Sequence, residues 1–219
     1  MRRGFLKWIG ILLLTALTIS GCSSIKGVLY KSEKVSQFSS HQEILILDGS
    51  PEIPMRVYKI TNREDSVLLR QDSQYITPDE NNEVLTRFIA RLYHTVIDSA
   101  SMGVGIAAPQ VGILKNIIWV QRFDKEGFPF ELYLNPKILQ YSEMKQTRRE
   151  GCLSVPNRTD TLHCRSYAIL IEYDRMNGEQ KVEMVEDFTA IIFQHEIDHL
   201  NGILYLDHLQ KEMEDARRK

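Results

Sequence analysis

The sequence has few cysteines, little net charge and no long hydrophobic run, and each shortage excludes a class of protein. Three cysteines in 219 residues are too few for a disulfide framework. Because 27 basic residues nearly balance 29 acidic ones, the net charge of −2 predicts no nucleic-acid partner. The absence of internal repeats excludes repeat architectures. A hydrophobic content of 43% is instead typical of a globular protein with a core.

The longest apolar run, over residues 8–19, is too short for a comfortable membrane span, which needs about 20 residues. It follows the basic start Met1-Arg2-Arg3 and therefore indicates a secretory signal. Small residues followed by Cys22 resemble a bacterial lipobox, whose cysteine becomes the lipidated first residue of the mature protein. We therefore predict an export signal over residues 1–22, a polar tether over residues 23–42, and an exported lipoprotein anchored to the membrane through Cys22 on the periplasmic or cell-surface side.

The N-terminal segment also permits other interpretations. It could be an uncleaved anchor helix with an incidental cysteine, or it could lack signal activity, which would leave the protein in the cytoplasm. Arg2-Arg3-Gly4-Phe5-Leu6-Lys7 resembles a twin-arginine signal, a route that exports folded proteins. Two ordinary arginines in a Sec signal are the alternative.

A metal-binding motif, H-E-x-x-H, lies near the C-terminus at residues 195–199. The apolar spacing upstream predicts a helix, with Asp187 as its N-cap and Asn201-Gly202 as its end. Residues four apart share one face of a helix, so His195 and His199 can bind one metal ion. Glu196 can then act as general base on a water molecule bound to that metal. The alternative is two ordinary histidines and a solvated glutamate.

A third ligand is needed, because catalytic sites of this kind usually have three protein ligands. Cys152 is a candidate, since it lies in the glycine-flanked segment Glu150-Gly151-Cys152-Leu153-Ser154-Val155-Pro156, which we interpret as a loop. A buried structural cysteine or a disulfide with Cys164 are the alternatives. Residues 103–112 contain G-x-G-x-x-A, but a helix precedes this stretch and Pro109 interrupts it, so a dinucleotide site is rejected. We expect a loop that holds the side chain of Gln110.

The remaining patterns predict a mixed fold in a single catalytic domain over residues 43–219. Helices are expected at residues 78–99, at the H-E-x-x-H motif and at 207–219. Strands are expected at residues 43–48, 55–60, 116–122, 131–134, 138–141, 167–174 and 180–185, with a hairpin turn at 176–178.

Three motifs occur in one order along the chain: Gly103-x-Gly105-x-Ala107-Ala108-Pro109-Gln110, Glu150-Gly151-Cys152-Leu153-Ser154 and Gln194-His195-Glu196-x-Asp198-His199. Together they resemble the peptide deformylase family, over about residues 66–209. The resemblance implies an α+β fold, with small antiparallel sheets around a central helix that carries the histidines. It also implies hydrolysis of the N-formyl group from the N-terminal methionine of new polypeptides, with release of formate.

The resemblance assigns a role to each matching residue. Cys152, His195 and His199 would be the metal ligands, and Glu196 the general acid/base. Gln110 and the backbone N–H of Leu153 would form the oxyanion hole, while Gly103, Gly105 and Glu150 would bind the peptide. One Cys and two His suggest zinc by ligand type. The resemblance implies ferrous iron, with zinc, nickel or cobalt as substitutes.

The sequence departs from the family pattern in two places. The predicted export signal would separate the protein from new formylated polypeptides in the cytoplasm, and Asn157 and Cys164-Arg165 differ from the usual pattern after Pro156, in a region that shapes the substrate cleft. An exported metallo-amidase or metallopeptidase acting on other N-acyl or peptide substrates is therefore an alternative. A non-catalytic lipoprotein that keeps the fold as a binding surface is a third possibility.

Overall fold

Five antiparallel strands form the main sheet, in the order β1-β2-β3-β6-β7. The computed structural model describes residues 37–99 and 102–218, which belong to one compact unit that begins at Ser36. The predicted export signal, Cys22 and most of the predicted tether lie outside the described residues. The strands of this sheet are β1 (Gly105–Ala107), β2 (Ile117–Gln121), β3 (Phe130–Tyr141), β6 (Ala168–Asp174) and β7 (Gln180–Glu186).

The two strands predicted at residues 131–134 and 138–141 are one continuous strand, β3. Irregular pairing with β6 around Asn135, whose φ is +50°, accounts for the interruption in the sequence pattern. The predicted strands at 116–122, 167–174 and 180–185 correspond to β2, β6 and β7.

A second sheet consists of the hairpin β4 (Lys145–Cys152) and β5 (Val155–Ser166). The expectation of a loop at residues 150–156 was wrong, because Cys152 ends β4 and Val155 begins β5 after a two-residue turn. Apolar and polar residues do not alternate regularly along these two strands, so the sequence pattern that would predict them is weak. The hairpin nevertheless positions the predicted third ligand at the end of a strand.

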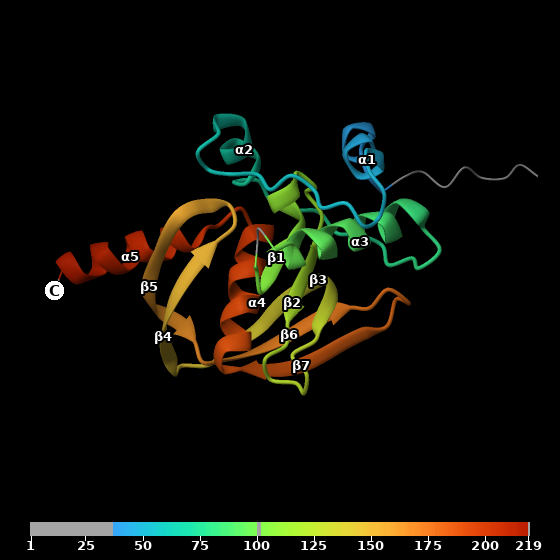
Figure 1. The fold of residues 1–219 in the computed structure, drawn as a ribbon. Helices are drawn as coiled ribbons and strands as arrows, with labels where there is room; N and C mark the ends of the chain where they lie inside the picture. Colours follow the sequence, from blue (N-terminus) through green and yellow to red (C-terminus); the bar gives the residue numbers. More distant parts are fainter. Residues whose placement is uncertain (1–36, 100–101, 219) are drawn as a thin grey trace, which may run out of the picture. The chain divides into compact units, whose positions relative to one another are not determined.

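Helix α4 (Asp187–Leu200) carries the H-E-x-x-H motif and lies between the main sheet and the β4–β5 hairpin (Figure 1). Its N-cap is Glu186 rather than the predicted Asp187. The helix ends at Asn201, as predicted, and Gly202 follows with a φ of +66°, a left-handed conformation that glycine adopts readily. Because α4 is buried on nearly every side, the motif is held in the core.

The predicted strand at residues 43–48 is wrong, because helix α1 (Ser40–Leu47) occupies this segment. Ser39 and Gln42 form a reciprocal capping box that begins the helix inside the predicted tether. Buried Arg91 binds the carbonyl oxygens of Leu45 and Ile46 near the other end of α1. These local and long-range contacts outweigh the strand preference of the apolar run at residues 44–47, so the folded domain begins before residue 43.

The other helices are α2 (Arg63–Leu68), α3 (Glu83–Ile97) and α5 (Tyr205–Arg217). Helix α3 lies within the predicted 78–99, and α5 begins two residues before the predicted 207. Residues 55–60, predicted as extended, belong to no regular strand. Among residues 37–99 and 102–218, no helix is long and apolar enough to cross a membrane.

Candidate active site

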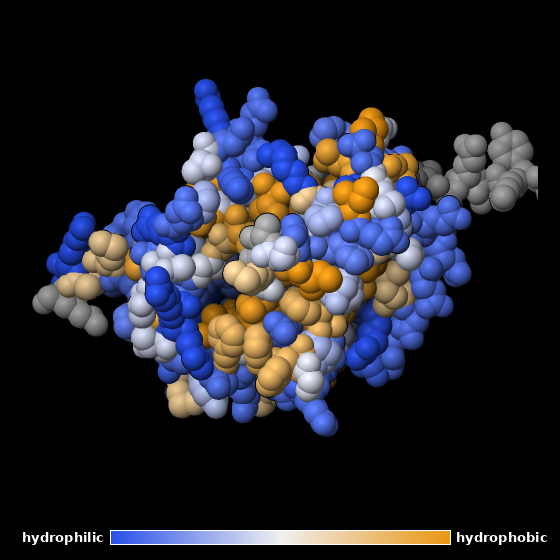
Figure 2. Space-filling model, in the orientation of Figure 1, coloured by the Kyte–Doolittle hydropathy of each residue, from blue (hydrophilic) through white to orange (hydrophobic). Residues whose placement is uncertain are grey.

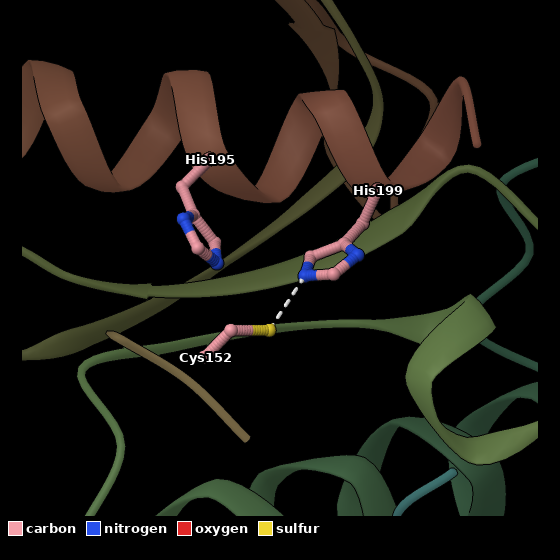
Figure 3. A group of neighbouring side chains, drawn as sticks. All are labelled: Cys152, His195 and His199. Atoms are coloured by element: carbon pink, nitrogen blue, oxygen red, sulfur yellow. Dashed lines mark hydrogen bonds between the residues drawn. The ribbon is translucent and has the colours of Figure 1, made fainter. Parts of the chain in front are cut away.

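Cys152, His195 and His199 converge at the contact between β4 and α4. The two imidazoles project from successive turns of the helix toward the thiol at the end of the strand (Figure 3). The Cys152 sulfur lies 3.1 Å from His199 Nε2, and one ligand atom from each residue lies within 4.8 Å of the others. The structure therefore brings together the three residues that the sequence predicts as metal ligands.

A buried network of charges holds His195 in one orientation. Its Nδ1 atom lies 2.9 Å from Glu150 Oε2, which leaves Nε2 on the side of the other ligands. Arg165 donates two hydrogen bonds to Glu150, at 2.8 and 3.0 Å, and a third, at 2.6 Å, to Asp198. His208 of α5 contacts the same Asp198 oxygen at 2.8 Å.

The Glu150 carboxylate therefore orients a ligand, which differs from the predicted substrate-binding role. Both of its oxygens are bonded to Arg165 or His195, so the side chain has little capacity left for a peptide. Burial would raise the pKa of Glu150, but the hydrogen bonds from His195 and Arg165 lower it to about 2. The carboxylate is thus ionised over the whole neutral range.

The ligand residues shift one another's protonation. Burial alone would raise the pKa of the Cys152 thiol, but His199 and His195 lower it well below its ordinary value. Burial would lower the pKa of His195, but Cys152 and Glu150 raise it well above its ordinary value. The thiolate form of Cys152 is the form that binds metal ions.

Glu196 is buried beside these ligands, with only 4% of its surface exposed. Burial raises the pKa of its carboxyl group to about 7, although the two nearby histidines oppose this shift. Its Oε2 atom has no hydrogen-bond partner among the described residues. A carboxyl group whose pKa lies near 7 and whose oxygen has no other partner can both accept and return a proton.

Gly105 on β1 provides the space that Glu196 occupies. A Cβ atom at this position would lie 2.5 Å from Glu196 Oε1 and 2.7 Å from Ile192 Cγ2. Any larger residue would therefore displace the carboxylate or the strand. The glycine predicted to bind substrate thus also has a packing role.

Gln110 is fixed in the short 3-10 helix η1 (Ala108–Val111). Its side-chain oxygen accepts a 2.8 Å hydrogen bond from the N–H of Ala107, so the amide nitrogen points toward the ligands. That nitrogen lies 3.3 Å from Ser154 Oγ and 3.5 Å from the Cys152 sulfur. A buried amide donor held in this way can stabilise negative charge that develops on a reacting carbonyl oxygen.

One cavity of about 680 Å³ connects these groups with the surface. Figure 2 shows a hollow beside the β4–β5 hairpin, with hydrophilic side chains over the hairpin and an apolar surface opposite. Predicted site residues that line the cavity are Gly103, Gly105, Gln110, Glu150, Cys152, Leu153, His195 and Glu196. His199 lies deeper, behind Cys152, and is almost fully buried.

The donor set fits a divalent metal ion. One thiolate and two imidazoles are suitable ligands for iron, zinc or nickel, and the Glu150 contact fixes the tautomer of His195 as metal sites usually require. Three protein ligands leave one position for water or substrate. The residues thus form a catalytic type of metal site rather than a closed structural one.

Sequence reasoning missed the groups that support the site. Arg165 and Asp198 act through other residues, and Ser154 contacts both Gln110 and Cys152, with its N–H 3.4 Å from the sulfur. Asp198 lies inside the H-E-x-x-H segment, but its ion pair with Arg165 could not be predicted, because the two residues are far apart in the sequence. Pairing between distant strands and helices produces these contacts, and no local spacing reveals them.

Comparisons with known proteins agree with this arrangement. The model of the polypeptide deformylase family matches residues 57–215. A peptide deformylase from Desulforudis audaxviator is 39% identical over 157 residues, which is 70% of this chain and 94% of the relative. Peptide deformylase 2 from Bacillus cereus is 31% identical, over 77% of this chain and 89% of the relative.

Solved structures give the same result. The peptide deformylase from Thermotoga maritima matches with a TM-score of 0.61 and 33% identity, over 71% of this chain and 97% of that one. The class I type b peptide deformylase from Acinetobacter baumannii, bound to Met-Ala-Ser, matches with a TM-score of 0.63 and 31% identity, over 72% of this chain and 99% of that one. The predicted α+β fold is confirmed, and this chain belongs to the peptide deformylase family, whose members are divalent-metal enzymes.

Proposed function

We propose that this protein removes the N-formyl group from peptides that begin with formyl-methionine and releases formate. The observation that supports this function best is the convergence of Cys152, His195 and His199 with Glu196 on one open cavity. Gln110 adds a buried amide donor on the same cavity. This combination suits hydrolysis of a small, exposed amide.

The side chains divide the chemistry between them. When bound, a divalent metal ion supplies Lewis acidity toward water and the formyl oxygen. Glu196 accepts the proton of the attacking water and then delivers it to the departing amine nitrogen. Gln110 Nε2 donates a hydrogen bond to the formyl oxygen as negative charge develops there. Glu150 and Arg165 keep His195 in the orientation that binding of the metal requires.

A metallo-amidase or metallopeptidase would differ from a peptide deformylase in the substrates that it cleaves. We expect formyl-Met-Ala-Ser to be converted to Met-Ala-Ser, while acetyl-Met-Ala-Ser and internal peptide bonds remain intact. The peptide bound by the Acinetobacter baumannii relative supports a cleft that accepts such a tripeptide. Mass spectrometry of the products distinguishes the activities, and cleavage of unformylated peptides at an equal rate would favour a metallopeptidase.

Ferrous iron is the metal that we propose for the native site, with zinc or nickel as the alternatives. The family resemblance is the basis for iron, and the thiolate of Cys152 is compatible with all three metals. Metal analysis of protein purified anaerobically from its native compartment tests this identity. Iron near one equivalent is expected, and stoichiometric zinc with full activity would contradict it.

We further propose that the enzyme is exported and anchored to a membrane through lipidated Cys22, where it would act on formylated peptides outside the cytoplasm. The apolar run at residues 8–19 and the small residues before Cys22 support this location. Radiolabelled palmitate and cell fractionation test it in parallel with Cys22→Ser. Label on the wild type alone is expected, whereas unlabelled protein in the cytoplasmic fraction would contradict export.

A further inference from the structure

Two arginines line the active-site cavity, Arg149 on β4 and Arg158 on β5. Arg158 is neutralised by Asp160, whose Oδ2 lies 2.7 Å from Arg158 Nε. Arg149 has no acidic partner within ion-pair distance among the described residues. It is therefore the arginine whose charge is available to a molecule in the cavity.

The orientation of Arg149 is fixed at its inner nitrogen. Nε donates a 2.7 Å hydrogen bond to Thr159 Oγ1 on the facing strand. Neither terminal nitrogen, Nη1 nor Nη2, makes a hydrogen bond to the residues that the structure describes. A guanidinium held in this way presents two parallel donors, which is the geometry that binds a carboxylate with both oxygens.

The position of Arg149 along β4 indicates which part of a substrate it meets. Residues 149–152 all line the cavity, so the cavity follows the end of this strand toward the metal ligands. Arg149 lies three residue steps along the strand from Cys152, a distance of about 10 Å at about 3.3 Å per step. An extended peptide with its formyl group at the ligands would bring its third residue to this distance.

The neighbouring residue Arg148 differs from Arg149 in its position and in its partners. Arg148 does not line the cavity, and its Nη2 lies 3.2 Å from the Asp187 carboxylate. It packs over the ring of Phe188 instead, at 5.4 Å from the ring centre. Of these two adjacent arginines, only Arg149 lines the cavity, and its terminal nitrogens have no partner among the described residues.

We propose that Arg149 is a specificity-determining residue that binds an acidic side chain at the third position of the formylated peptide. This inference rests on the proposed function and adds a substrate class to it, namely peptides of the type formyl-Met-x-Glu or formyl-Met-x-Asp. The free C-terminal carboxylate of a tripeptide offers the same chemistry from a different source. The two sources are separated by amidating the C-terminus.

The test compares kcat/KM of the full chain in detergent for formyl-Met-Ala-Glu-amide, formyl-Met-Ala-Gln-amide and formyl-Met-Ala-Lys-amide. Because Arg149 is exposed, we expect a preference of about three- to fivefold for Glu over Gln at low salt, and a smaller one at 1 M salt. The ratio should approach one in Arg149→Gln, and Arg149→Glu should prefer the Lys peptide. Arg148→Gln is the matched control and should keep the wild-type ratio.

Thr159→Val keeps the shape of the threonine side chain but removes the hydrogen bond that fixes Arg149. It should therefore reduce the Glu-to-Gln ratio of kcat/KM without removing the charge. Calorimetric binding of the same amides to Glu196→Gln measures the preference independently of turnover.

Failure of the proposed function would appear as absent formate release from all three peptides. A Glu-to-Gln ratio of one in wild type, in turnover and in binding, would overturn the role of Arg149, and so would a preference that persists in Arg149→Gln. A preference only for the free-acid tripeptide over its amide would assign Arg149 to the C-terminus and overturn the side-chain specificity.

Discussion

At Glu196, burial and catalysis impose opposite requirements on one carboxyl group. Burial favours the protonated form and raises the pKa from 4.5 to about 7, while proton abstraction needs the ionised form. A carboxyl group whose pKa is raised in the folded state stabilises the protein below its unfolded value of 4.5, and this contribution is lost as pH rises toward 7.

Glu196→Gln should therefore change how stability depends on pH. For metal-free protein, we expect the unfolding free energy of the variant relative to wild type to increase between pH 4.5 and pH 8, by on the order of 3 kcal/mol. Denaturant unfolding at several pH values measures this difference. Parallel curves for the two proteins would contradict the raised pKa.

Gln110→Ala should reduce kcat by about 10² to 10³ while the metal is retained, because one donor to the developing oxyanion is lost. The substitution also removes the 2.8 Å hydrogen bond that Gln110 accepts from the N–H of Ala107, so the fold of the variant is checked first by circular dichroism. Steady-state kinetics with parallel metal analysis checks this expectation. Unchanged turnover would remove Gln110 from the oxyanion hole.

Glu150→Gln should weaken metal binding by about 10- to 100-fold, since the amide cannot orient His195 and balance Arg165 as the carboxylate does. The measurement is a metal competition titration on protein whose fold is first checked by circular dichroism. A variant that binds metal as tightly as wild type would show that the Glu150 contact is not needed to orient His195.

The sequence identified the chemical groups at the residue scale but not the contacts between them. Spacing within one helix predicted that His195 and His199 would share a face, and ligand chemistry made Cys152 a candidate for the third ligand. The family resemblance then assigned Gln110 to the oxyanion hole. The contacts of Glu150 with Arg165 and His195 were not predicted, because these partners come from β5 and α4. Long-range pairing of this kind has no local pattern.

At the scale of elements, the site depends on the contact of β1 with α4. Gly105→Ala should lower kcat by at least about 10² and destabilise the protein by about 1–3 kcal/mol, because the new methyl group would lie 2.5 Å from Glu196 Oε1. Gly127→Ala is the control, since a Cβ there would meet nothing within 4 Å despite a φ of +75°. The control should lose some stability but keep its turnover; equal activity in Gly105→Ala would contradict the close packing.

The success of element prediction followed the strength of the local signal. Helices α3 and α4 have apolar residues at helical spacing, and strands β2, β6 and β7 contain apolar segments between polar turns, so all five were predicted near their observed positions. Helix α1 was wrongly predicted as a strand from its apolar run. A capping box and the contacts of Arg91 decide its conformation, and the run itself does not reveal them. The β4–β5 hairpin was missed, although it contributes Cys152, because its polar faces resemble a loop.

At the scale of the whole molecule, the compact unit from Ser36 onward contains every group that the proposed reaction needs. The buried charge network around Arg165 connects the hairpin, α4 and α5, so three separate parts of the fold hold the ligands. The export signal that we propose for the N-terminus would determine where the enzyme acts, and the folded unit determines what it does.

The central claim is tested most directly by release of formate from formyl-Met-Ala-Ser. The full chain would be purified anaerobically in detergent, loaded with Fe²⁺ and measured beside the matched variant Glu196→Gln. We predict rapid release by the wild type and a rate at least about 10²-fold lower in the variant, at equal metal content. No formate from folded, metal-loaded wild type, or equal rates in the two proteins, would contradict deformylation by this site.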